Sequence, residues 1–271
     1  GMALIAVLWI VAAMAILVAG MGQSVRQQIR VVASARDAVV AQAQADAAIQ
    51  LTLQALQTAP QPPTAMQAHG VEFGGVPVQV IIQPLNGFID IDRAPAPLLA
   101  ALLEVAGGLP AGQAETLAQT LVDWRGSRPD GAGGPYHFEA VEDLLLVPGI
   151  DYALLERLRP LITTDEAGGG QVNPLAANAD VLAVLARGNT VRAAQIAAAR
   201  DAGQTGIDTT ALDSRFLATG STGRYRLEAR VPAGEGRIEA FSRTVALGEN
   251  PSGVPWRTLR TERRLQSADA P

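Results

Sequence analysis

The first strong pattern in the chain is an apolar run at its beginning. No charged residue occurs between Met2 and Val25, and the run ALIAVLWIVAAMAILVAGMG (3–22) is apolar on every face of a helix. A run of this length crosses about 30 Å of hydrocarbon, so we predict a transmembrane anchor over residues 1–22. The core of a signal peptide is the alternative, but such cores run roughly 7 to 15 residues and end in a small-residue cleavage site.

A helical pattern continues beyond the apolar run. Residues 23–57 contain neither proline nor glycine, so we predict one continuous helix that ends at about residue 58, before the prolines at 60, 62 and 63. We expect the segment 23–58 to pack on a globular domain. The apolar stripe available for that packing is formed by Val32, Ala35, Val39, Ala43 and Ile49.

Two stretches alternate apolar and polar residues with the two-residue period of strands. VEFGGVPVQVIIQPL (71–85) alternates around a glycine pair, as a hairpin or bent strand does, and RYRLEARV (224–231) alternates throughout. The turn PAGEG (232–236) leads into RIEAFSRTVAL, which predicts a second hairpin, and WRTLRTERRL (256–265) predicts an added edge strand. We therefore expect a small antiparallel sheet, formed by residues 59–92 and 221–271, on either side of a long insertion.

The insertion, residues 93–220, is rich in alanine and has helical periodicity. Its loops include a glycine- and proline-rich segment, 126–135, and the run Gly168–Gly170, which we interpret as a flexible joint. The overall prediction is an α+β fold. The expected helices are 97–106, 111–124, 138–145, 151–161, 179–186 and 191–202.

Composition narrows the function classes. All 21 basic residues are arginine and there is no lysine or cysteine, which excludes Schiff-base chemistry, thiol nucleophiles and thiolate metal sites. The only histidines, His69 and His137, have no ligand-spaced partner and no neighbouring nucleophile, so a membrane-tethered hydrolase ranks last and we predict no enzymatic activity. The formal net charge of -5 does not favour nucleic-acid binding.

One segment resembles a helix-hairpin-helix. In VEDLLLVPGIDYALLERLRPLI (141–162), two short helices meet at the turn Pro148, Gly149 and Ile150. Such hairpins can present backbone amides to a phosphate, which leaves a membrane-anchored DNA-binding or DNA-uptake protein as the alternative function, but Asp151 and Glu156 weigh against it.

Two further segments have a common pattern, in which an Asp or Asn precedes a predicted helix with leucines on one face. They are IDIDRAPAPLLAALL (89–103) and VNPLAANADVLAVL (172–185). We predict that Asp92 and Asn173 cap those two helices.

Taken together, these features resemble the K-type minor pseudopilin of the type II secretion system. The resemblance spans nearly the whole chain and is most specific in the start GMALIAVLWIV, in LVDWRGSRPDGAGGPYHFEAVEDLLLVPGI (121–150) and in the entry at Val172 and Asn173. It implies a pilin-like fold whose inserted domain is of the helix-hairpin-helix or SAM-like type. It also implies cleavage by a prepilin peptidase between Gly1 and Met2, followed by methylation of the new amino terminus.

The resemblance also implies a position in the pseudopilus. Other pilin-like subunits carry a glutamate at the fifth residue of the mature chain, where this chain has Ala6, and a buried carboxylate needs a cationic partner in hydrocarbon. A subunit without it suits the tip of the filament. The implied partners are the I-type and J-type minor pseudopilins, the major pseudopilin and the assembly platform, with the exported protein or the secretin as further contacts.

The resemblance implies an inner-membrane protein with its C-terminal part in the periplasm. Arg26, Arg30 and Arg36 favour the opposite orientation by the positive-inside rule, which a short basic leader before Gly1 would reverse. No cofactor is required. K-type subunits have an acidic, calcium-binding loop, which is shortened here, and the candidate ligands are Asp123, Asp130 and Glu142.

Overall fold

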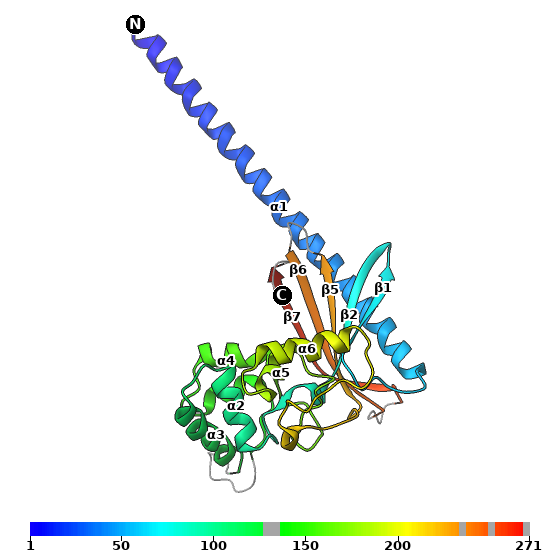
Figure 1. The fold of residues 1–271 in the computed structure, drawn as a ribbon. Helices are drawn as coiled ribbons and strands as arrows, with labels where there is room; N and C mark the ends of the chain where they lie inside the picture. The colour runs from blue at the N-terminus through cyan, green and yellow to red at the C-terminus, as the bar shows by residue number, and fades with distance from the viewer. Residues whose placement is uncertain (127–135, 233–236, 249–252, 268–271) are drawn as a thin grey trace.

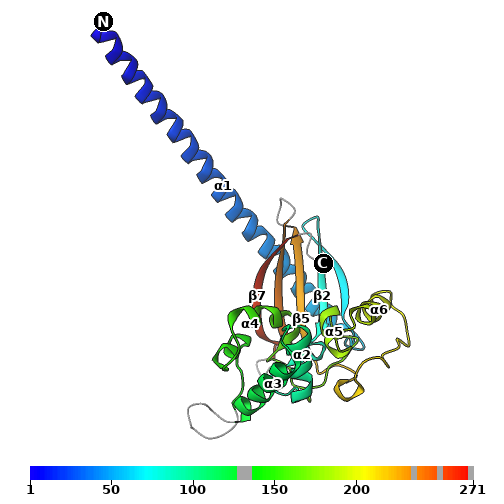
Figure 2. The same cartoon turned by 60° about the vertical axis from the view of Figure 1, so that its left-hand side comes forward.

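The computed structural model describes residues 1–126, 136–232, 237–248 and 253–267, without the side chains of 15–31, 237 and 265–267. A long helix, an antiparallel sheet and a group of short helices follow one another in space (Figure 1). The helix α1 projects from one end of the molecule, and the short helices lie at the other end of the sheet (Figures 1 and 2).

Helix α1 (Met2–Thr58) runs for 57 residues without a break. At 1.5 Å per residue it is about 85 Å long. The chain becomes extended at Ala59, ahead of Pro60, which has no amide hydrogen to continue the helix. Within the part of the chain that the structure describes, no helix is both long enough and apolar enough to cross a membrane. The predicted span continues into residues 15–22, whose side chains lie outside the described set.

The predicted contact stripe of α1 was wrong in all but one residue. Val32, Ala35, Val39 and Ala43 are exposed, and only Ile49 is buried. The helix reaches the sheet only from residue 41 onward, so the earlier apolar positions have nothing to pack against (Figure 1). The side chains of α1 that the sheet buries are Ala41, Ala45, Ala48, Ile49, Leu53 and Leu56.

The sheet has the strand order β1-β2-β5-β6-β7, and every neighbouring pair is antiparallel. Strands β1 (Gln67–Phe73) and β2 (Val76–Pro84) form the first predicted hairpin, and β5 (Arg224–Pro232) and β6 (Arg237–Leu247) form the second. Strand β7 (Trp256–Ser267) is the predicted edge strand. The expectation of an α+β fold with an antiparallel sheet is confirmed.

The alternation along β5 decides which face of the sheet α1 covers. Tyr225, Leu227, Ala229 and Val231 are buried and pack against α1, and the residues between them point to the opposite face. We call this opposite face, which carries Arg224, Arg226, Glu228 and Arg230 from β5, the outer sheet face. Its arrangement bears on the further inference below.

The helical unit between β2 and β5 has a hydrophobic core of its own, distinct from the core under α1. It begins with the short 3-10 helix η1 (Leu85–Gly87) and ends with another, η4 (Ser214–Phe216). A short parallel pair, β3 (Ile89–Asp90) and β4 (Ile162–Thr163), joins its early and middle parts. Its α-helices are α2 (Ala96–Val105), α3 (Ala111–Gly126), α4 (Tyr152–Leu158), α5 (Ala179–Leu185) and α6 (Thr190–Asp201).

Two predicted helices of this unit differ from the observed ones. The segment expected as a helix over 138–145 is the 3-10 helix η2 (Val141–Leu146), because Asp143 accepts hydrogen bonds from the amides of Glu139 and Ala140 and delays the first turn. The helix expected over 151–161 ends as α4 at Leu158. It continues as the 3-10 helix η3 (Arg159–Leu161), which carries a proline near its start.

The predicted caps at Asp92 and Asn173 were wrong. Helix α2 starts after Pro95, and Asp92 instead accepts a hydrogen bond from the amide of Phe138 at 3.0 Å. Helix α5 is capped by Asn178, whose side chain accepts from the amide of Val181. Both mistaken residues precede their helices too far along the chain for a side chain to reach the free amides of the first turn.

The interpretation of Gly168–Gly170 as a flexible joint was also wrong. Gly170 is buried with φ +80°, and a Cβ added there would lie 2.2 Å from the carbonyl oxygen of Arg93. Only glycine fits such a close approach at a positive φ. Gly170, the last residue of the run, is therefore packed against the residues that precede α2.

Candidate functional site

The three candidate calcium ligands are not brought together among the described residues. Asp123, in α3, accepts a hydrogen bond from Gln119 Nε2 at 2.8 Å, and Glu142, in η2, forms an ion pair with Arg159 at 2.7 Å. Asp130 lies outside the described residues. Within the described ranges, no cluster of three or more His, Asp or Glu side chains is arranged to hold a metal ion. The calcium site stays a prediction.

The hairpin predicted at Pro148, Gly149 and Ile150 is a tight turn between η2 and α4. Gly149 has φ +96°, the amide of Ile150 donates to the carbonyl of Val147 at 3.2 Å, and the Ile150 side chain enters the core of the helical unit. The Asp151 carboxylate accepts from the amide of Leu154 and so caps α4. This carboxylate stands next to the exposed turn, where a phosphate would have to bind.

The residues on either side of the segment 127–135 make packing contacts. Arg125 donates from its two Nη atoms to the carbonyl oxygens of Ile91, at 2.8 Å, and Ala94, at 2.6 Å. Tyr136 and Phe138 stack edge to face with ring centroids 5.3 Å apart. The two bonds of Arg125 hold the end of α3 against the residues that precede α2.

The two histidines are both exposed. His69 lies on β1, and His137 lies beside Phe138. Neither is part of a cluster of potential metal ligands among the described side chains.

Two buried carboxylates that the sequence analysis did not single out lie where the helical unit meets the sheet. Asp90 ends β3 and Glu166 follows β4; both are buried, and each has one oxygen without a hydrogen-bond partner among the described residues. Arg93 Nη1 donates to the carbonyl oxygens of Glu166, at 2.8 Å, and Gly168, at 3.2 Å, and lies 3.9 Å from Asp90 Oδ2. Burial raises the pKa of Asp90 to about 7, although the amide of Asp92 donates to its Oδ1.

A charged network links the helical unit to the last strand. Arg260, on β7, donates to Asp165 Oδ2 at 2.9 Å and to the carbonyl oxygen of Glu139. Arg224, on β5, donates to the carbonyl oxygen of Asp165 at 2.7 Å. Two arginines of the sheet therefore donate hydrogen bonds to one acidic residue of the helical unit, and these bonds hold the unit at that end of the sheet.

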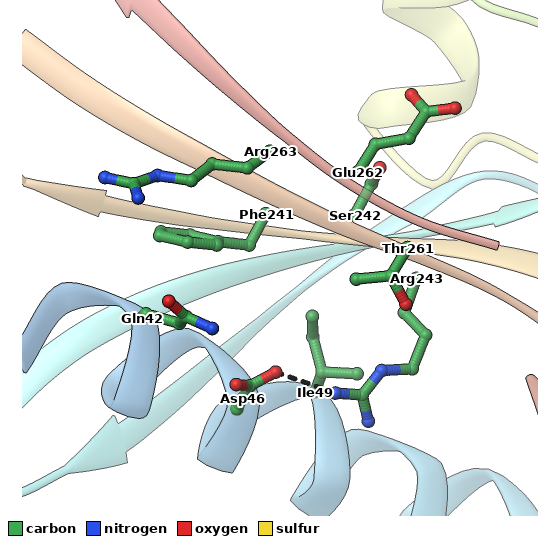
Figure 3. A pocket seen from close by; sticks show the side chains of 9 residues that line it. All are labelled: Gln42, Asp46, Ile49, Phe241, Ser242, Arg243, Thr261, Glu262 and Arg263. Carbon is green, nitrogen blue, oxygen red and sulfur yellow. Dashed lines mark hydrogen bonds and ion pairs between the residues drawn. The ribbon is translucent and has the colours of Figure 1, made fainter. Parts of the chain in front are cut away.

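A groove opens between α1 and the strands β6 and β7 (Figure 3). On one wall, Asp46 of α1 forms an ion pair with Arg243 of β6 at 2.7 Å. On the other, the Arg263 guanidinium lies over the Phe241 ring at 5.4 Å from its centroid. Ile49 forms the apolar floor between α1 and the sheet (Figure 3). Seven of the nine residues that line the groove are polar or charged, but these seven include no arrangement of nucleophile, base and acid.

The overall arrangement, a projecting helix packed on an antiparallel sheet with a helical unit between β2 and β5, matches a solved structure. That structure is a chain of the GspK-GspI-GspJ complex from the type 2 secretion system of enterotoxigenic Escherichia coli. The TM-score is 0.50 with 14% sequence identity, over 88% of this chain and 98% of the other. The fold is pseudopilin-like. No family model and no curated protein matches the sequence.

The pseudopilin-like fold leaves several predicted positions untested. Gly1 precedes α1, Met2 is the first residue of that helix, and Ala6 is exposed on its projecting part. No contact within the chain assigns a role to any of them. The buried carboxylates of Asp90 and Glu166 could not be predicted from the sequence, because they are 76 positions apart and only the pairing of β3 with β4 brings them together. The closely spaced Asp90 and Asp92 were the one local signal of this site.

Proposed function

We propose that the protein is a K-type minor pseudopilin that occupies the tip of the type II secretion pseudopilus. There it primes assembly with the I-type and J-type minor pseudopilins for export across the outer membrane. The observation that carries the proposal is the pseudopilin-like fold with a large helical unit placed between two strands of the sheet. The residue-level resemblance of the segment 121–150 to K-type subunits supports the same assignment.

The shape of the molecule is consistent with a terminal position. The helical unit lies at the end of the sheet away from the start of α1, to one side of the C-terminal part of that helix (Figures 1 and 2). A subunit stacked beyond it would have to accommodate this bulk. In addition, Ala6 offers no carboxylate to the amino terminus of a neighbour in hydrocarbon, which suits a subunit with no successor.

The proposal includes an anchor in the inner membrane, with the sheet and helical unit in the periplasm. It rests on the apolar run at 3–22 and on the resemblance, which also implies prepilin-peptidase cleavage between Gly1 and Met2. The proposed role is structural, without a catalytic step. Its other partners would be the major pseudopilin and the assembly platform.

Deletion of the gene in the native host tests the proposal against DNA uptake. We expect the deletion to block export of the proteins that use the type II pathway, and expression of the full chain to restore it, while natural transformation is unchanged. Normal export together with lost transformation would refute the proposal and favour DNA uptake.

A further inference from the structure

Four arginine side chains of the described structure stack on phenylalanine rings, and three of them form an ion pair with a carboxylate. Arg187 and Arg215 lie over Phe216 and both pair with Asp213, at 3.2 and 2.7 Å. The third, Arg263 on β7, lies over Phe241 of the neighbouring strand β6 and pairs with Glu239 at 2.9 Å. A carboxylate thus accompanies each of these stacked guanidinium groups.

The fourth, Arg226 on β5, differs from the other three. Its guanidinium is the nearest of the four to its ring, 4.2 Å from the centroid of the buried Phe88. No hydrogen bond or ion pair joins Arg226 to another described residue, and its Nε is buried without an acceptor. Leaving such a group without an acceptor is costly, since charged groups lose their water on burial. Arg226 as a whole residue is nevertheless not fully buried, so it is not sealed off from solvent.

The carboxylates with the largest electrostatic effect on Arg226 already form ion pairs with other arginines. Glu228 pairs with Arg230 at 2.8 Å, and Glu262 pairs with Arg264 at 3.0 Å. Asp165 is held by Arg260 at 2.9 Å. The described residues therefore supply no further carboxylate for Arg226, even though the chain carries more acidic than basic residues overall.

The strand register arranges the charges of the outer sheet face in rows. Arg226 and Arg260 both pair with Thr244 of β6 from opposite sides, which gives a basic row. The next row, two residues along, holds Glu228 and Glu262, and the row after that holds Arg230 and Arg264. Successive rows are about 7 Å apart, the repeat of one strand face. The face thus reads basic, acidic, basic along the strands.

We propose that Arg226 is the receptor for a carboxylate of a partner protein, presented by an extended segment that lies along the outer sheet face. A segment whose alternate residues read acidic, basic, acidic would match the three rows with the same two-residue spacing. Arginine is suited to this task because its planar guanidinium binds a carboxylate through two parallel hydrogen bonds. The acidic row disfavours a phosphodiester chain, which requires a continuous basic surface.

Peptide binding to the purified full chain tests this proposal, measured by fluorescence anisotropy in an uncharged detergent at low salt. The probe is the labelled peptide Thr-Glu-Thr-Lys-Thr-Glu-Thr, compared with the charge-swapped peptide Thr-Lys-Thr-Glu-Thr-Lys-Thr. We expect saturable binding of the probe and binding of the swapped peptide that is at least about tenfold weaker. Equal binding of the two peptides would overturn the proposed charge pattern.

The matched variants are Arg226→Met, which keeps apolar contact with Phe88, and Arg187→Met, which removes a stacked arginine that already has a carboxylate. Loss of one charge-assisted pair predicts binding about 10- to 100-fold weaker for Arg226→Met and unchanged for Arg187→Met. Arg226→Gln gives the same test should the methionine variant not fold. Unweakened binding to a folded Arg226 variant would refute the site. Arg226-dependent binding of duplex DNA that is tighter than that of the peptide would refute a protein ligand. Because the chain is assayed alone, the result is independent of the proposed secretion role.

Discussion

The buried carboxyl group of Asp90 predicts an unusual pH dependence of folding. Its side chain is only 3% exposed, and its Oδ2 has no hydrogen-bond partner among the described residues. Burial raises its pKa from 3.8 to about 7, so the folded state favours the neutral acid over the carboxylate. Replacing Asp90 with asparagine keeps an oxygen for the amide of Asp92 and removes the charge at every pH.

The sign and size of the effect follow from proton linkage. Between pH 3.8 and 7 the folded state binds more protons at Asp90 than the unfolded state does, so the contribution of Asp90 to stability falls as pH rises. A difference of roughly three pKa units corresponds to about 4 kcal/mol. We therefore expect Asp90→Asn to be more stable than the wild type by up to about 4 kcal/mol at pH 8, with the advantage vanishing near pH 4.

Urea unfolding of the full chain in an uncharged detergent, followed by tryptophan fluorescence from pH 4 to pH 8, measures this difference. The exposed substitution Asp123→Asn makes the same chemical change at a site that shares none of these contacts and serves as the control. A wild type that is as stable as Asp90→Asn at pH 8, or a difference between them that does not change with pH, would refute the reasoning.

Three further substitutions test the packing described above. Gly170→Ala should lower the free energy of unfolding by about 1 to 3 kcal/mol, because the new Cβ meets a carbonyl oxygen at a positive φ. Gly169→Ala, where the new Cβ has open space, is the control, and equal thermal stability of the two variants would contradict this reasoning. Arg125→Met leaves two carbonyl oxygens without their donor and should cost about 1 to 3 kcal/mol in urea unfolding, and an unchanged midpoint would count against the bonds. Asp46→Asn should cost no more than about 1 kcal/mol, because its pair with Arg243 is partly exposed, and a larger loss would mean that the groove is more important for stability than its exposure indicates.

The sheet could be predicted from the sequence because its signals are local. The alternation over 224–231 and the turn at 232–236 lie within one hairpin, and the observed strands follow that pattern. Helix α1 was equally clear in extent, since a long stretch without proline or glycine ends at a proline cluster. Its contact face was not, because apolar residues recur around the helix and only the position of the sheet selects among them.

The features at the sheet and helical-unit junction could not be predicted, because each one joins distant segments. Asp92 has the residue type of a helix cap, yet its partner is the amide of Phe138, 46 positions away. Gly170 has the sequence context of a flexible linker, but it packs against the backbone of Arg93, which is 77 positions earlier in the chain. The stacking of Arg226 on Phe88 likewise depends on a contact that no local pattern encodes.

The most direct test of the proposed function is the mass of the complex that the chain forms. The full chain would be co-expressed with the I-type and J-type minor pseudopilins of the same organism, extracted in detergent, and analysed by size exclusion with light scattering. We predict a single complex whose protein mass equals one copy of each subunit. If the I-type and J-type subunits pair with each other while this chain elutes alone, the assignment to the pseudopilus tip is contradicted.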